Sequence, residues 1–144
     1  MIAKHARRLD EQDHKILALW ASDCAEHVLP FFEQIYPEDK RPRQAIEAAR
    51  AWVRGELPIV DARKAAFASH AAAREASNAA AQAAARAAGH AAATAHVADH
   101  ARHAAAYALK AAEISGNAAG AERDWQNRCL PEHLRPVAFP TPRD

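Results

Sequence analysis

The sequence has little of what most folds other than a helical bundle require. Its 144 residues include four glycines, eight prolines and two cysteines, and aromatic residues make up 6% of the chain. Only 23 residues are Leu, Ile, Val or Phe. So few β-branched and aromatic side chains exclude an all-β fold and a Rossmann-type sheet. The low glycine, proline and cysteine content excludes collagen and a disulfide scaffold.

The chain also has almost no net charge and no long apolar run. The chain has 19 Lys and Arg residues against 18 Asp and Glu residues, which argues against a dedicated nucleic-acid binder. The least charged stretch, residues 76–98, has polar side chains among its alanines and does not read as a membrane span. The charged N-terminus lacks the apolar run of a signal peptide. We therefore expect a cytoplasmic protein with reduced cysteines and with no nucleic-acid or membrane partner.

Alanine is abundant instead. It supplies 41 of the 72 hydrophobic residues and 27 of the 48 residues from 65 to 112. Alanine is the best helix former, and its small side chain lets helix axes approach to about 8 Å. The pattern predicts closely packed alanine-rich helices at the centre of a bundle. The bulky residues expected to cover them from the outer helices are Trp20, Phe31, Phe32, Trp52 and Trp125.

The fold class predicted by apolar spacing and helix-capping residues is all-α, a compact bundle of five to six antiparallel helices. We expect one helical domain over residues 1–136 and an irregular C-terminal tail over residues 137–144. The expected helices run from Asp13 to Pro30, from residues 39–42 to Gly55, over 59–75, from Ser77 to 93, from Thr94 or His96 to Ile114, and over 118–130.

Five of the nine histidines lie between residues 70 and 103. On a helix that starts before His96, the side chains of His96 and His100 share one face, as in half of a divalent-metal site. Metal sites need third and fourth ligands, and neither a Cys-x-x-Cys motif nor a glutamate-containing zinc-protease signature accompanies this pair. The other interpretation is a structural polar stripe, in which neutral histidines bond Asp99 or backbone carbonyls, and we favour it.

Arginines recur through the second predicted helix. Because guanidinium groups bind carboxylates and phosphates in a bidentate manner, Arg41 and Arg43, with Glu47, are candidate partner-binding residues. The helical spacing of Glu47 among Arg43, Arg50 and Arg54 is also typical of a solvated face of mixed charge. We favour the solvated face and leave Arg41 and Arg43 as candidate contacts.

Catalytic motifs are not found. The chain has no Gly-x-Ser-x-Gly motif, no glycine-rich phosphate loop and no paired carboxylates on an apolar surface. Cys24 follows Asp23, whose negative charge opposes thiolate formation. We therefore predict a non-enzymatic protein without a cofactor, in which Cys24 belongs to the core.

Four stretches, at 17–33, 41–56, 87–112 and 122–136, resemble in order the Imm5-like family of small all-helical bacterial immunity proteins. The most distinctive motifs are RPRQAIEAARAW and GHAAATAHVADHA. The resemblance implies stoichiometric binding and neutralisation of a cognate toxin. The residues that match these motifs and form the candidate partner-binding or structural positions are Arg41, Arg43, Glu47, Gly89, His90, Thr94, His96, Asp99 and His100.

Three functional hypotheses follow. The first is an immunity protein that binds a toxin. The alternative is a histidine-containing helical bundle that binds a divalent metal and has hydrolytic activity. A third is a structural protein that associates with itself through its alanine face. The oligomeric state is left open.

Overall fold

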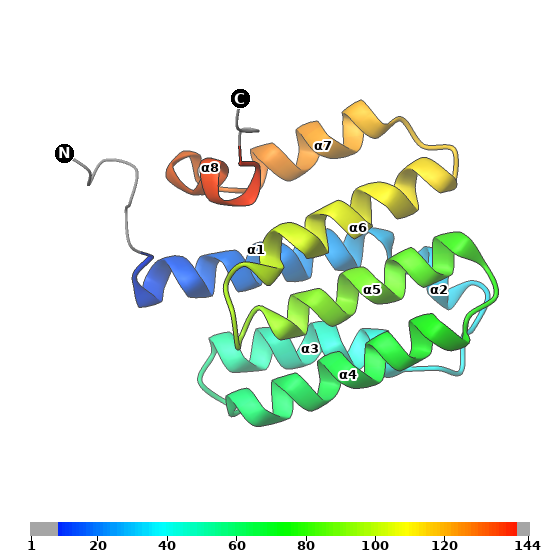
Figure 1. The fold of residues 1–144 in the computed structure, drawn as a ribbon, viewed down its shortest axis with the longest axis horizontal. Helices are drawn as coiled ribbons and strands as arrows, with labels where there is room; N and C mark the ends of the chain where they lie inside the picture. Colours follow the sequence, from blue (N-terminus) through cyan, green and yellow to red (C-terminus); the bar gives the residue numbers. More distant parts are fainter. Residues whose placement is uncertain (1–8, 141–144) are drawn as a thin grey trace.

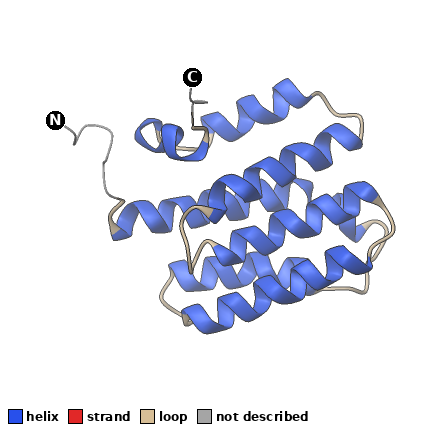
Figure 2. Ribbon diagram, viewed as in Figure 1, coloured by secondary structure: helices blue, strands red, loops and turns tan. Residues whose placement is uncertain are grey.

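The computed structural model describes residues 9–140, and this part of the chain is built from helices without strands (Figure 2). The expected fold class is confirmed, since six of the helices within these described residues have ten or more residues. Residues 1–8 of the expected domain and 141–144 of the expected tail lie outside the described residues. The long helices are α1 (Glu11–Val28), α3 (Arg41–Val53), α4 (Ile59–Glu75), α5 (Ala79–Ala93), α6 (His100–Ile114) and α7 (Ala119–Arg128). The short elements are α2 (Pro30–Glu33), a 3-10 turn (Glu132–Leu134) and α8 (Arg135–Ala138).

The helices form two layers. Helices α4, α5 and α6 lie side by side, α1 and α3 pack behind them, and α7 lies beside α6 (Figure 1). We call the solvent-facing side of α4, α5 and α6 the front face; it includes Phe67, Arg86 and Tyr107. None of the described helices combines the length and apolarity needed to cross a membrane.

Helix α5 is the centre of the bundle. It contacts α1, α2, α3, α4 and α6, and every residue from Ala80 to Ala92 is buried except Gln82, Arg86 and His90. The predicted closely packed alanine centre is confirmed. Because neighbours enclose α5 on its other sides, these three polar residues, each four positions from the next, form its line of contact with solvent.

The bulky residues cover this centre unequally. Trp20 and Phe32 are fully buried, and Phe31 and Trp125 are partly buried against the core. Trp52 is only half-buried, and its ring lies 4.9 Å from that of His14.

Three helices start elsewhere than the sequence predicts. Asp10, not Asp13, caps α1, and its carboxylate accepts a bond of 2.8 Å from the Asp13 amide. Asn78, not Ser77, caps α5 in the same way. Helix α6 begins at His100, several residues later than expected.

Two hydrogen bonds hold the turn between the end of α5 and the start of α6. The Thr94 hydroxyl donates to the His90 carbonyl at 2.9 Å, and the His14 ring of α1 donates through Nε2 to the Thr94 carbonyl at 2.6 Å. The carbonyl of Thr94 is thus used by a side chain of another helix. The chain turns through residues 94–99 before α6 can begin.

Buried hydrogen bonds dock α7 onto the bundle. The indole Nε1 of Trp20 donates to the carbonyl of Gln126 at 2.8 Å, and the Gln126 amide donates to the carbonyl of Ala105 at 2.9 Å. Gln126 is fully buried, and its side-chain NH2 group has this acceptor in place of water, whereas its Oε1 has no hydrogen-bond partner among the described residues.

Candidate functional site

Four histidines meet at the centre of the front face. The ring of His90 on α5 lies 4.9 Å from that of His70 on α4, and 5.1 and 5.3 Å from those of His100 and His103 on α6. Tyr107 stacks on His90 with ring centroids 5.4 Å apart. We call His70, His90, His100 and His103 the histidine cluster.

Hydrogen bonds assign the protonation of His70 and constrain that of His90 and His100. Arg86 donates through Nη1 to Nδ1 of His70 at 3.0 Å. Because a guanidinium group has no acceptor, His70 is neutral and holds its proton on Nε2. The Nδ1 atoms of His90 and His100 lie 2.9 Å apart, so one ring donates and the other accepts.

The pKa values agree with this assignment. Burial, together with the charge of Arg86, lowers the pKa of His70 to about 4. Burial and the neighbouring histidines lower the pKa of His90 to about 3. Burial and His103 also lower the pKa of His100, although Asp99 opposes the shift. These three rings of the cluster are therefore neutral at pH 7.

Gly89 makes room for the histidine cluster. A Cβ atom at this position would lie 2.7 Å from both Cε1 and Nε2 of His70, which is too close for two nonbonded atoms. Helix α5 continues through Gly89, although glycine costs about 1 kcal/mol relative to alanine inside a helix. Gly89 thus lets the imidazole of His70 pack directly on the backbone of α5.

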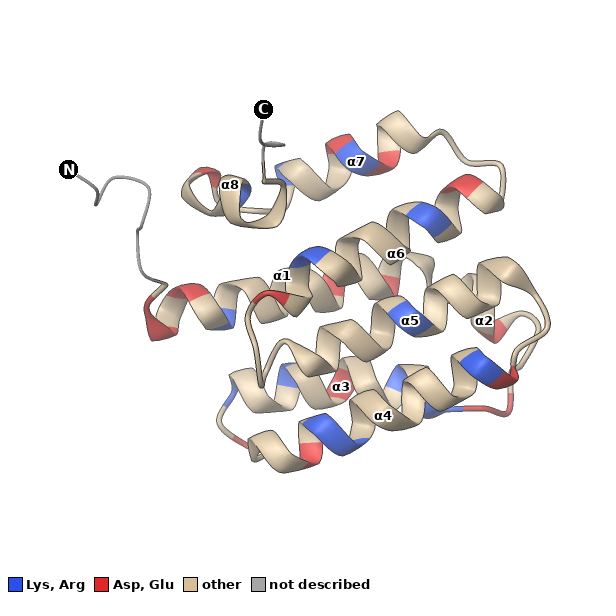
Figure 3. Cartoon of the chain, viewed as in Figure 1, with Lys and Arg blue, Asp and Glu red and all other residues tan. Residues whose placement is uncertain are grey.

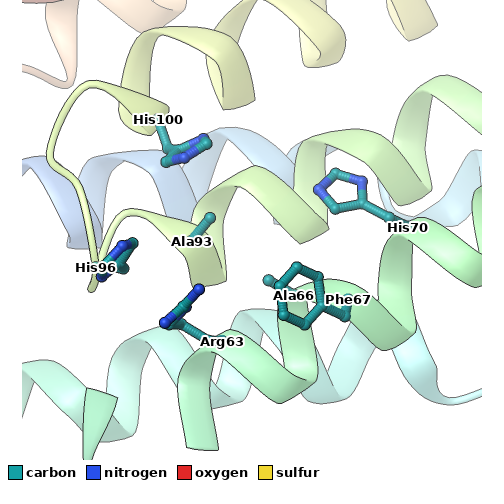
Figure 4. A pocket seen from close by; sticks show the side chains of 7 residues that line it. All are labelled: Arg63, Ala66, Phe67, His70, Ala93, His96 and His100. Atoms are coloured by element: carbon teal, nitrogen blue, oxygen red, sulfur yellow. The ribbon is translucent and has the colours of Figure 1, made fainter. Parts of the chain in front are cut away.

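A pocket of about 240 Å³ opens beside the cluster, between α4, the end of α5 and the start of α6 (Figure 4). At its edge, the ring of Phe67 is 62% exposed, and the guanidinium carbon of Arg63 lies 5.9 Å from the ring centroid. The lining residues are Arg63, Ala66, Phe67, His70, Ala93, His96 and His100.

A second pocket, of about 210 Å³, lies between α5 and α6 at the other end of the same face. Arg86, Tyr107 and Lys110 contribute to its lining. Arg86 thus lies between the two pockets, because it also bonds His70 of the first.

The structure separates the residues of the predicted polar cluster. His90 and His100 lie together in the histidine cluster, whereas Thr94 is fully buried at the end of α5. His96 is exposed in the loop before α6 and lines the pocket. Asp99 is exposed, and Arg102 donates to it at 2.8 Å.

The expected helical pair of His96 and His100 does not form, because α6 begins only at His100. Within residues 9–140, no group of three or more His, Cys, Asp or Glu side chains is placed to hold a metal ion.

The candidate arginines of α3 are engaged within the molecule. Nη2 of Arg41 lies 2.7 Å from carboxylate oxygens of both Asp39 and Glu75, and Arg43 donates two bonds of 2.7 Å to Glu33. Glu47 is exposed on the same helix. The two arginines therefore tie α3 to α4 and α2, and their guanidinium groups already have carboxylate partners.

The sequence interpretation misses Arg63, Phe67, His70 and Arg86. His70 and Arg86 lie on different helices, sixteen positions apart, and within an alanine-rich sequence nothing marks them as neighbours. The one available signal is Gly89, a residue unfavourable inside a helix, which indicates that another group approaches the backbone closely.

A family model described as "Imm-5 like putative immunity protein" matches residues 7–133, which include the histidine cluster, the pocket and α3. No match is found with a curated protein or a solved structure. A match over most of the chain shows the family: the chain belongs to the Imm-5 like immunity protein family.

Proposed function

We propose that this protein is a cytoplasmic immunity protein that neutralises a cognate bacterial toxin by binding it stoichiometrically. The observation that carries the proposal is the family match over residues 7–133. Stoichiometric binding uses a surface with exposed apolar and charged side chains, and it needs no catalytic group.

The front face meets this requirement. Its three helices pack against one another, and α5 is anchored on its other sides by α1 and α3. The exposed Phe67 ring and the half-buried Arg86 represent two of the residue classes that are enriched in protein interfaces, aromatic residues and arginine.

Co-expression tests the proposal. Each open reading frame that flanks this gene is expressed from an inducible promoter, alone and together with this protein. We expect one flanking product to arrest growth when expressed alone and to be tolerated when this protein is present. Light scattering of the purified mixture is then expected to give the mass of a stoichiometric complex.

A matched control is the same strain with a frameshifted copy of this gene. This control keeps the plasmid and the transcript but does not make the protein. If no flanking product arrests growth, or if arrest persists with the intact protein, the proposal is wrong. Rescue without a complex would contradict stoichiometric binding and point to another mode of protection.

A further inference from the structure

Most cations of the layer formed by α4, α5 and α6 lack carboxylate partners among the described residues. Between residues 59 and 114 the chain has six basic and four acidic residues, and the acidic ones lie near the helix ends (Figure 3). Of the six basic residues, only Arg102 has a carboxylate within 4.0 Å among the residues that the structure describes. The five without such a partner are Arg63, Lys64, Arg74, Arg86 and Lys110.

The arginines of α3 behave differently. Arg41, Arg43 and Arg50 form ion pairs of 2.7 to 2.9 Å with carboxylates of α1, α2, α4 or the loop before α3. Arg54, which follows α3, pairs with Glu56 at 2.9 Å. A partner that binds an already paired arginine must replace an existing carboxylate, whereas one that binds Arg63 or Arg86 adds a new pair. Uncompensated positive charge therefore favours the front face as the surface for an acidic partner.

Exposed apolar side chains are concentrated on the same layer. Of the seven large hydrophobic residues exposed in the described part of the chain, five lie between residues 59 and 114, and Phe67 is the most exposed. These five are Ile59, Val60, Phe67, Val97 and Ile114. Exposed apolar groups beside charged ones are typical of a protein interface.

The donors around the first pocket are complementary to a carboxylate. His70 uses Nδ1 to accept from Arg86 and keeps a proton on Nε2. Arg63 is exposed at the pocket and has no acceptor atoms. His70 and Arg63 thus both offer N–H donors. A carboxylate accepts hydrogen bonds from such donors, whereas an ammonium or guanidinium group has no acceptor atom.

We propose that the front face binds an acidic surface of the toxin, that one carboxylate side chain of the toxin enters the pocket at Arg63 and His70, and that an apolar side chain packs on Phe67. The inference rests on the proposed function, since it names the binding surface and the partner chemistry of the same interaction. Phe67 is the apolar anchor, and Arg63 supplies the charge.

Two substitutions test this surface. Arg63→Glu reverses the charge at the pocket, and Phe67→Asp removes the exposed ring. The matched controls are Arg54→Glu, with the same charge change on an exposed arginine, and Leu19→Asp, at an exposed apolar residue of α1. Glu47→Lys examines the α3 surface, where an exposed carboxylate stands among arginines.

The dissociation constant is measured by calorimetry against the toxin identified by growth arrest, with thermal unfolding as the check on folding. We expect Arg63→Glu and Phe67→Asp each to weaken binding at least about tenfold, and the controls and Glu47→Lys to change it less than about threefold. Added salt is expected to weaken the wild-type complex more than the Arg63→Glu complex, because the variant has lost an attractive charge pair.

Three results would overturn the inference. If folded Arg63→Glu and Phe67→Asp bind like the wild-type protein, the front face is not the binding surface, although the immunity function stands. If Glu47→Lys alone weakens binding, α3 is the surface. If the wild-type protein binds none of the flanking products, the proposed function fails and this inference fails with it.

Discussion

Replacing Gly89 by alanine examines directly how the histidine cluster is packed. The added Cβ would lie 2.7 Å from two atoms of the His70 ring, so the ring must move. Movement of the ring disturbs the 3.0 Å bond from Arg86 and the 4.9 Å ring contact with His90. The same substitution improves the intrinsic helix propensity of α5.

The two effects have opposite signs and similar sizes. Alanine in place of glycine inside a helix stabilises by about 1 kcal/mol. Overpacking costs about 1–3 kcal/mol. We therefore expect Gly89→Ala to lower the free energy of unfolding by about 0–2 kcal/mol in the wild-type protein. In a His70→Ala background the clash is absent, and the same change is expected to stabilise by about 1 kcal/mol.

Urea unfolding of the four proteins of this double-mutant cycle measures the coupling between Gly89 and His70, which we expect to be about 1–3 kcal/mol. Because the helix-propensity gain cancels in the cycle, the coupling reports only the contact. Equal stabilisation by Gly89→Ala in both backgrounds would refute the packing of His70 on this glycine.

Three further predictions concern the rest of the bundle. The pKa of His90 is about 3 in the folded protein, against an ordinary value of 6.5. The neutral ring therefore contributes its full stabilisation above pH 6.5, and this contribution is lost as the pH falls toward 3. Lowering the pH should thus decrease the unfolding temperature more in the wild-type protein than in the His90→Gln variant. Ala92→Leu, at a fully buried position, should lower the free energy of unfolding in urea by about 1–3 kcal/mol. Ala106→Leu, at an exposed position of α6, should leave it almost unchanged. Equal effects of the two substitutions would contradict the close packing. Gln126→Ala should cost about 1–3 kcal/mol because the bond to Ala105 is lost, and an unchanged unfolding curve would show that this bond does not stabilise the docking of α7.

The start of α6 shows why residue spacing alone mispredicts the site. His96 and His100 are four residues apart, which places two side chains on one face only if both belong to one helix. The carbonyl of Thr94 is taken by His14, about eighty positions earlier in the chain, and α5 ends there. A contact so distant in sequence leaves no local pattern, so spacing alone does not reveal that α5 ends before His96.

The arginines of α3 show a similar limit. Their helical spacing indicates an exposed charged face, and Glu47 and Arg54 are indeed exposed. Their availability to a partner depends on acids elsewhere, such as Glu33 of α2 and Glu75 of α4. Ion pairing between helices is a property of the packed molecule, so the sequence left open what the structure shows to be intramolecular pairs.

The sequence by itself determined the helical class, the span of α4 and the alanine centre, because helix propensity and apolar spacing act over a few neighbouring residues. Only the tertiary structure decided which histidine rings are in contact and which arginines have no carboxylate partner. It also explains the glycine in the middle of α5, because the His70 ring packs on Gly89. The physical reason is the separation in sequence over which each kind of interaction acts. Propensities act within one helix, whereas the cluster, the pocket and the free charges of the front face arise from side chains of three helices that packing brings within a few ångströms.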